Sequence, residues 1–495
     1  MPKYNLLDKK FKKQLLSINN SLENSFNKIK VLKSNIKRLS LSKDNKVFLG
    51  IGIFIILSLS YFLIPSIYNK ELIKDEIKNH LVSKYKINLN FSDKINYSFL
   101  PKPHYIIKDL SILNKENEIG KVGNLKIFIS INNFFSSKNL EIKDIVLDKT
   151  EFNISKDDLI FFQNLLNTKP SKNKISIKNS IIFYKNDNDE VLFINKIFNS
   201  KFYYDSNYLE NILISKNEIF NVPYTLEIKK NEFDKIIFSN FKSRKLRVNI
   251  ENAINYEYAN KTGTLDILLL NKDTSLKYEL QKDLIKFKSD GIKNNYDGEV
   301  ELKPFYLNAN FYYDGISTKD LFNDKSVFFE IIKSEILNNK NLSTSLNLNI
   351  KKIVNIDELK DLFLQIGIED GNFNLSESNI MWKDDLKIKL QDSQLSYDEN
   401  EVSLFGRVDI EVKDIEDFYK SFQIKKKSRK LIEKIQFDFY FNFDQQKINF
   451  DNVKIDSNYI EKLDRFIDNF NTKGKILNKI MLKNFINDLF DIYAG

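Results

Sequence analysis

KIQFDFYFNFDQQKINF, residues 434–450, alternates apolar and polar side chains along its first ten residues. Successive side chains of a β-strand point to opposite faces of a sheet, so alternate positions share a face. One face would carry the apolar side chains of Ile435, Phe437, Phe439, Phe441 and Phe443. The other face would carry mainly polar ones, those of Gln436, Asp438, Tyr440 and Asn442. The stretch therefore predicts an antiparallel strand with one apolar and one wet face.

The same period of two recurs far from this stretch. Apolar residues follow it at Leu125, Ile127 and Ile129, at Leu342, Leu346 and Leu348, and at Leu386, Ile388 and Leu390. Turn-forming clusters at 185–190, 313–315 and 369–371 separate such runs. Since no Pro/Gly/Ser-rich linker divides them, we expect a mainly β protein with helices, built on one extended antiparallel sheet with helices at its ends.

The composition agrees with a folded, strand-rich chain. Its 495 residues are 42% hydrophobic, with 41 Phe and 23 Tyr against only 13 Gly and 7 Pro. Aromatic side chains favour half-buried strands, and the low Gly and Pro content excludes a low-complexity class. The length exceeds one compact core of ordinary size, which leaves several domains or one elongated body.

Few residues suited to catalysis are present. The chain has no Cys and only two His, His80 and His104, which excludes disulfides, thiolate nucleophiles and Cys-ligated zinc. No glycine-rich phosphate cradle and no metal-ligand spacing occurs. His80 falls on an expected helix beside lysines, and His104 in a strand-like region. We therefore expect no enzyme, cofactor or metal, although two carboxylates converging from separate strands could still form a glycosidase pair.

The net charge of +10 is concentrated at the N-terminus. Residues 1–46 hold 12 Lys or Arg and 3 acidic residues, which accounts for +9 and leaves about +1 for the rest. A body of nearly zero net charge does not attract phosphates, so no nucleic-acid partner is expected. The basic run at 425–430 is interpreted as a solvated helix end or turn rather than a lipid-phosphate contact.

One segment is apolar enough to cross a membrane. Residues 47–64 contain no charge over eighteen positions, about the minimum for spanning the hydrocarbon layer. A cleaved signal peptide is the alternative, but the apolar run is long and no small-x-small cleavage site follows it. The larger number of Lys and Arg before the segment predicts a cytoplasmic N-terminus and an exported body.

Helical spacing appears in five other places. In the tail, apolar residues at three- and four-residue steps from Leu15 to Leu39 predict either a helix on the anionic inner leaflet or a short coiled coil. Further helices are expected at 66–86, at 356–366, around Phe418 and in the segment from Leu463 onward.

The order of these parts resembles the AsmA family of bacterial envelope proteins. The likeness rests on INLNFSDKINYSFLPKPHYIIKDLSILN (87–114), on the strand pair at 123–154, on the C-terminal stretch 368–422 and on the ending LKNFINDLFDIYAG. The matching motif positions are Phe99, Pro101 and Pro103 in the first segment and Asp370, Gly371 and Gly406 in the third.

This resemblance implies a bacterial inner-membrane protein in which an N-terminal transmembrane helix is followed by an elongated, curved antiparallel β-sheet groove with amphipathic helices at its ends. The periplasmic body would bind or conduct phospholipid along this apolar groove and support outer-membrane lipid homeostasis and assembly. Its partners would be the inner membrane, phospholipid and outer-membrane or envelope-assembly proteins. The groove candidates are Leu125, Ile127, Ile129, Leu342, Leu346, Leu348, Phe437, Phe439, Phe441 and Phe443. The alternative is a membrane-tethered periplasmic scaffold or regulator of outer-membrane protein assembly, which carries no lipid.

Five parts are expected from this resemblance. The first two are a basic cytoplasmic tail with an amphipathic helix (1–46) and a transmembrane anchor (47–67). They are followed by an AsmA-like N-terminal region (68–160), a central β-sheet body (161–360) and an AsmA-like C-terminal region with terminal helices (361–495).

Overall fold

The computed structural model describes most of the chain from residue 43 onward. The described residues are 43–494 without 92–93, 116, 132–133, 135–140, 168–172, 187, 232, 234, 256, 258–260, 270–271, 290–293, 303–304, 318–326, 335, 337–338, 355, 376, 399–400, 460 and 473–478. The amphipathic pattern from Leu15 to Leu39 lies outside them. The chain divides into two compact units, Met1–Ile67 and Tyr68–Gly495.

The described part of the first unit is one apolar helix and a short continuation. Helix α2 spans Lys43–Leu63 and the 3₁₀ turn η2 spans Ile64–Ile67. The segment Val47–Ile67 contains an 18-residue window with a mean hydropathy of 2.6, and no residue of that window is buried within the chain. Its length and composition suit a single membrane span, as the sequence predicted for the start of the chain.

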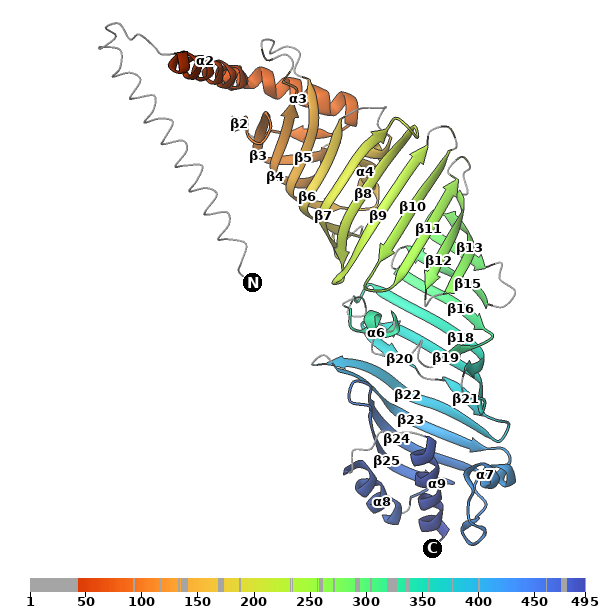
Figure 1. Cartoon of the computed structure of the whole chain (residues 1–495). Coiled ribbons are helices and arrows are strands. Elements are labelled where there is room, and N and C mark those ends of the chain that lie inside the picture. The colour runs from red at the N-terminus through yellow and green to blue at the C-terminus, as the bar shows by residue number, and fades with distance from the viewer. Residues whose placement is uncertain are drawn as a thin grey trace. The chain divides into compact units, whose positions relative to one another are not determined.

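The described residues of the second unit form one long sheet of 26 strands (Figure 1). Its first half comprises β1 (Asn88–Asn90), β2 (Ile95–Ser98), β3 (His104–Asn114), β4 (Asn117–Ile129), β5 (Ile142–Ile154), β6 (Lys174–Lys185), β7 (Val191–Asp205), β8 (Glu210–Ile219), β9 (Val222–Asn231), β10 (Ile236–Ser243), β11 (Val248–Asn255), β12 (Lys261–Leu269) and β13 (Lys272–Gln281). The mainly β class with a single long sheet is thus confirmed.

The second half continues the same sheet. It comprises β14 (Leu284–Ser289), β15 (Asn294–Leu302), β16 (Phe305–Tyr313), β17 (Ile316–Ser317), β18 (Leu342–Val354), β19 (Leu359–Glu369), β20 (Asn372–Asn374), β21 (Asn379–Trp382), β22 (Leu386–Asp398), β23 (Glu401–Val412), β24 (Lys434–Asn442), β25 (Lys447–Ile455) and β26 (Asn458–Tyr459). The alternating stretch that opened the sequence analysis forms β24 and the start of β25.

Most neighbouring strands pair antiparallel, but three pairs do not. The pairs β5–β6, β16–β18 and β17–β18 are parallel, so the expectation of a purely antiparallel sheet is wrong at these points. A parallel neighbour requires a crossover connection, which usually holds a helix. The connection from β5 to β6 holds η3 (Asp157–Leu159) and α4 (Ile160–Leu166), and that from β17 to β18 holds α6 (Val327–Ile332).

Both crossovers contact distant strands. Lys156, just before η3, forms an ion pair with Asp283 in the turn between β13 and β14. Asn339, just before β18, donates from Nδ2 to the carbonyl oxygen of Leu192 in β7 at 3.0 Å. The crossovers therefore tie strands together that lie more than a hundred residues apart.

One other helix precedes the strands in the chain, two lie between β23 and β24, and two follow β26. They are α3 (Lys70–Tyr85), α7 (Ile415–Phe422), η5 (Lys426–Ser428), α8 (Glu461–Thr472) and α9 (Lys479–Ala494). The helices expected at 66–86, around Phe418 and after Leu463 are present.

The helix expected at 356–366 is wrong, because β19 occupies most of that range. Leu362, Leu364 and Ile366 pair in succession with Ile350, Leu348 and Leu346 of β18. Apolar residues on both faces of the strand had imitated helical spacing.

Candidate functional site

Cross-strand partners place apolar residues on one face of the sheet along nearly its whole length. Residues directly opposite each other in a ladder project to the same face. From β3 to β25 this face, called the apolar face below, is linked by pairs such as Ile107↔Leu125, Leu125↔Leu147, Leu213↔Ile228, Phe241↔Ile250, Leu265↔Leu276, Tyr278↔Phe287, Val300↔Leu307, Phe311↔Leu348, Leu348↔Leu364 and Leu404↔Phe441. No turn or bulge transfers the apolar set to the other side.

At the N-terminal end the apolar residues are closed into a core. Ile73, Ile77 and Leu81 of α3 are each 1% exposed, and α3 contacts β1. Phe161 of α4 lies 5.7 Å from the ring of Phe152 in β5 and is buried. The groove candidates of this region belong to the same closed core, because Leu125, Ile127 and Ile129 are 0%, 0% and 4% exposed.

At the C-terminal end three helices cover the apolar face. Phe439 of β24 pairs with Phe450 of β25, whose ring lies 5.7 Å from Phe470 of α8 and 5.1 Å from Phe485 of α9. Phe437 and Phe441 pack at the border of this cluster, to which α7 contributes Phe418. These strands bury their aromatic face against the chain's own helices.

A smaller cluster around α6 contains three of the remaining groove candidates, and the fourth, Leu342, lies outside it. Ile332 of α6 is buried with Ile366 and Ile368 of β19, and Leu346, Leu348 and Phe443 pack at its border. Leu342 is half-buried and pairs with Phe305 at the start of β16.

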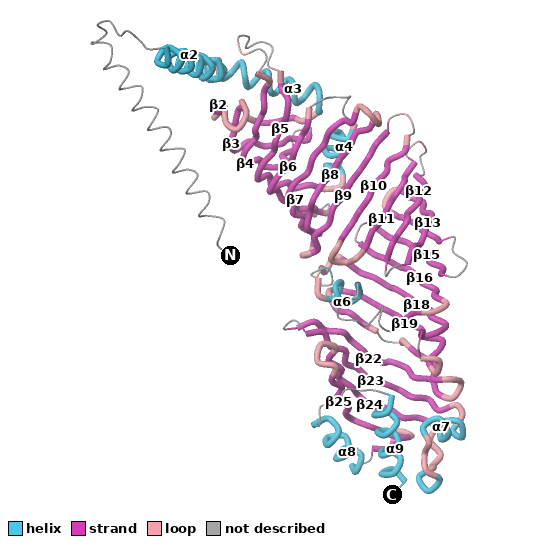
Figure 2. Tube along the Cα trace, viewed as in Figure 1, coloured by secondary structure: helices cyan, strands magenta, loops and turns pink. Residues whose placement is uncertain are grey.

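Between these covered ends lies a run of eight strands, β9–β16, which we call the uncovered stretch. Among the described residues from 174 to 317 none is helical, and Figure 2 shows strands following one another there. Most apolar side chains on this part of the apolar face are only half-buried: Leu226, Ile228, Ile237, Phe241, Ile250, Ile254, Leu265, Ile267, Tyr278, Leu280, Ile285, Phe287, Val300, Leu302, Leu307 and Phe311. The stretch offers apolar surface to an occupant.

Polar groups interrupt this surface, and two sets of them bond to one another. Tyr278 donates its hydroxyl to Asn252 Oδ1 at 2.7 Å, and Asn252 Nδ2 donates to Ser239 Oγ at 3.1 Å. Tyr224 of β9 donates to Asn195 Oδ1 at 2.8 Å, and burial raises the pKa of Tyr224 to about 12. These groups are satisfied within the face and leave the surrounding surface apolar.

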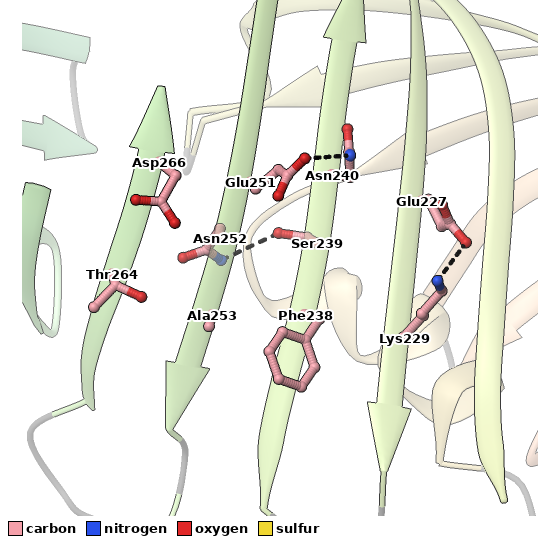
Figure 3. A pocket seen from close by; sticks show the side chains of 10 residues that line it. All are labelled: Glu227, Lys229, Phe238, Ser239, Asn240, Glu251, Asn252, Ala253, Thr264 and Asp266. Atoms are coloured by element: carbon pink, nitrogen blue, oxygen red, sulfur yellow. Dashed lines mark hydrogen bonds and ion pairs between the residues drawn. The ribbon is translucent and has the colours of Figure 1, made fainter. Parts of the chain in front are cut away.

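The opposite face of the same strands is polar. A shallow depression crosses β9–β12 there (Figure 3), where Lys229 lies 3.1 Å from Glu227 and Asn240 donates to Glu251 at 3.4 Å. Phe238 also lines it, with a 44% exposed side chain. Its charges are largely paired with each other, and it holds no nucleophile and base in contact.

The two histidines lie apart from the uncovered stretch. His104 is 4% exposed, stacks on Phe128 at 4.9 Å, and has a ring nitrogen 2.7 Å from the carbonyl oxygen of Lys102. Burial and the charge of Lys84 lower the pKa of His80. Among the described residues no three His, Asp or Glu side chains are grouped as a metal site would require.

The motif positions are structural. Pro103 is buried and its carbonyl oxygen accepts from the amide of Ile129 at 3.0 Å, whereas Phe99 is half-buried and Pro101 is exposed. Asp370 and Gly371 form the turn from β19 to β20 with φ of 50° and 81°.

Gly406 pairs with Phe439, and a Cβ there would lie 2.6 Å from the Cα of Ser393. That close approach requires glycine.

The residues of the uncovered stretch were not among the sequence candidates. Their signal was the same period of two, for example Ile250, Asn252 and Ile254, but these runs are short and a polar residue interrupts them. No protein-family model and no curated protein matches the chain, so its likeness to the AsmA family rests on the segments quoted above.

Proposed function

We propose that this chain is an AsmA-like, inner-membrane-anchored protein that binds or conducts phospholipid along the apolar face of its sheet. The observation that carries the proposal is the uncovered stretch, where cross-strand register gives continuous apolar surface that no helix within the described residues of that range covers. In this proposal the body has no catalytic role and no nucleic-acid partner.

Acyl chains require such a surface. Moving about sixteen CH₂ groups from a bilayer into water costs about 0.8 kcal/mol each, or about 13 kcal/mol in total. Strands stack about 4.8 Å apart, so eight strands extend over about 34 Å, close to the roughly 30 Å of a bilayer's hydrocarbon core. The stretch therefore suits one or two lipids with their chains across the strands.

The proposed placement follows from charge and length. The apolar segment Val47–Ile67 anchors the chain, and the excess of Lys and Arg before it favours a cytoplasmic N-terminus. The second unit would then be periplasmic and would supply lipid for outer-membrane homeostasis.

A scaffold for envelope-assembly proteins is the second candidate. It is favoured by the covered ends, where α3 and α7–α9 close the apolar face with the chain's own side chains. A scaffold needs no lipid, so the two functions differ in what occupies the uncovered stretch.

The test measures bound phospholipid on the full chain by native mass spectrometry. The variant Phe241→Asp with Ile267→Asp places charges on the apolar face of β10 and β12 and should lose lipid at least tenfold. The matched control, Phe238→Asp with Leu268→Asp, changes exposed side chains on the polar face of the same strands and should keep it.

Circular dichroism checks that both variants fold. A wild-type chain that is folded, monodisperse and lipid-free would exclude the carrier and favour the scaffold.

A further inference from the structure

The loop from α7 to β24, residues 423–433, is held firmly at several points and is called the basic loop below. Ile424 and Ile432 are each 2% exposed and belong to the C-terminal core cluster. Ser428 is buried and donates its hydroxyl to Asp491 of α9, and Tyr419 of α7 donates to the carbonyl oxygen of Lys430. The loop is therefore built on fixed supports.

Five of six consecutive residues in this loop are basic, from Lys425 to Lys430. Lys425 lies 2.6 Å from Asp491, and Arg429 lies 3.9 Å from Glu416. The other three, Lys426, Lys427 and Lys430, form no ion pair with any described residue. Lys430 donates to the carbonyl oxygen of Tyr493 at 3.0 Å and lies over its ring, which leaves its charge unneutralised. The loop thus keeps a local positive charge although the body as a whole is nearly neutral.

Leu431 follows these cations and is 82% exposed. Its neighbour Ile432 is 2% exposed. Of these two adjacent apolar side chains, Ile432 is therefore buried and Leu431 is presented to solvent. Phosphates of a nucleic acid would attract the lysines but would gain nothing from the leucine. An anionic lipid surface is attracted to the lysines and accepts the leucine among its acyl chains.

We propose that the basic loop docks on an anionic lipid surface, with Lys426, Lys427 and Lys430 over the headgroups and Leu431 at the acyl boundary. This reverses the sequence interpretation of 425–430 as a solvated turn. The docking surface lies outside the apolar face, so it does not depend on the proposed lipid carriage.

The experiment uses the full chain held by its apolar helix in nanodiscs of phosphatidylcholine. These are mixed with vesicles of phosphatidylglycerol and phosphatidylcholine, and co-flotation gives the partition coefficient. Each lysine near an anionic surface contributes about fivefold in binding, so Lys426→Gln with Lys427→Gln should lower the coefficient about 30-fold. Leu431→Ser should lower it about tenfold, including in high salt.

Two matched controls change side chains of similar exposure elsewhere. Lys286→Gln with Lys288→Gln removes two exposed lysines from β14, and Phe233→Ser removes a 77% exposed aromatic ring from the turn after β9. Both should bind as the wild type does.

The proposal is overturned if the loop variants float with the vesicles as well as the wild type, which would assign binding to the basic residues at 1–46. It is also overturned if the wild type ignores the vesicles, or if it binds a single-stranded RNA instead and Leu431→Ser leaves that binding unchanged. Loss in the loop variants alone supports it, whether or not the apolar face carries lipid.

Discussion

The C-terminal end of the sheet and the uncovered stretch both carry apolar residues on the same face of the sheet. They differ in what packs against that face. In β24 the apolar residues pack against α8 and α9, and Phe439 is 9% exposed. In β10 and β12, Phe241 and Ile267 occupy equivalent positions and remain half-buried. The alternation that makes a strand is the same in both regions, so the returning amphipathic helices decide whether the face becomes core or surface.

The largest expected effect separates the two regions by stability. Phe490 of α9 is 0% exposed and its ring lies 5.4 Å from Phe418, so Phe490→Ala should cost about 4 kcal/mol. Phe287 on the uncovered stretch is half-buried, and Phe287→Ala should cost about 1 to 2 kcal/mol.

Urea unfolding followed by circular dichroism measures both. The only Trp of the chain, Trp382, stacks on Phe422 at 5.5 Å, and its emission reports the C-terminal core separately. Equal losses in the two variants would remove the distinction between covered and uncovered regions.

A second prediction concerns the border of the uncovered stretch at Tyr224. Burial raises its pKa to about 12, whereas an unfolded tyrosine titrates near 10. The folded state then keeps a proton that the unfolded state loses, so stability falls as pH rises from about 10 to 12, by about 2 to 3 kcal/mol. In urea titrations, the free energy of unfolding of Tyr224→Phe should fall between pH 10 and 12 by about 2 to 3 kcal/mol less than that of the wild type. An unchanged pH profile would mean that the face is already open to water at β9.

The third prediction concerns the edge of β25 at Phe450, outside the part of the strand that pairs with β26. Asn471 of α8 accepts from the amide of Phe450 at 3.0 Å and donates to its carbonyl oxygen at 2.7 Å, as a neighbouring strand would. Asn471→Ala should cost about 2 kcal/mol and promote self-association by edge pairing. Urea unfolding and sedimentation measure the two effects. Asn469→Ala, on the same helix and exposed, is the control and should change neither.

The smallest effect is expected at the tie between the first crossover and the uncovered stretch. Lys156 and Asp283 are each about one-third exposed, so Lys156→Met should cost less than about 1 kcal/mol. Lys121→Met, which breaks the more exposed pair with Glu118, sets the baseline for urea unfolding. A loss above about 2 kcal/mol would show that the crossover supports β13 and β14 more than a surface ion pair can.

The sequence was sufficient where the information is local. The period of two at 434–450 predicted β24, and the spacing around Phe418 predicted α7. It was misleading at 356–366, because Phe363 lies on the opposite face of β19 from Leu362 and Leu364, and apolar residues on both faces imitate helical spacing.

The covering of the apolar face is a tertiary property that alternation does not encode. Phe439 and Leu125 have the pattern expected of a groove and yet lie in closed cores. For the same reason the uncovered stretch was overlooked, although Ile250 and Ile254 share one face as Phe437 and Phe439 do.

The three parallel pairings also bear on the order in which the chain assembles. Elsewhere each strand pairs with the strand before it or, at β1–β3, β19–β21 and β20–β22, with the strand two before it, so contacts are local. At β6 and at β18 the chain must first complete a crossover before the next strand can join. Folding of the sheet is thus divided into three blocks, β1–β5, β6–β17 and β18–β26. While a crossover is incomplete, the last strand of the preceding block has an open edge that another chain could pair with.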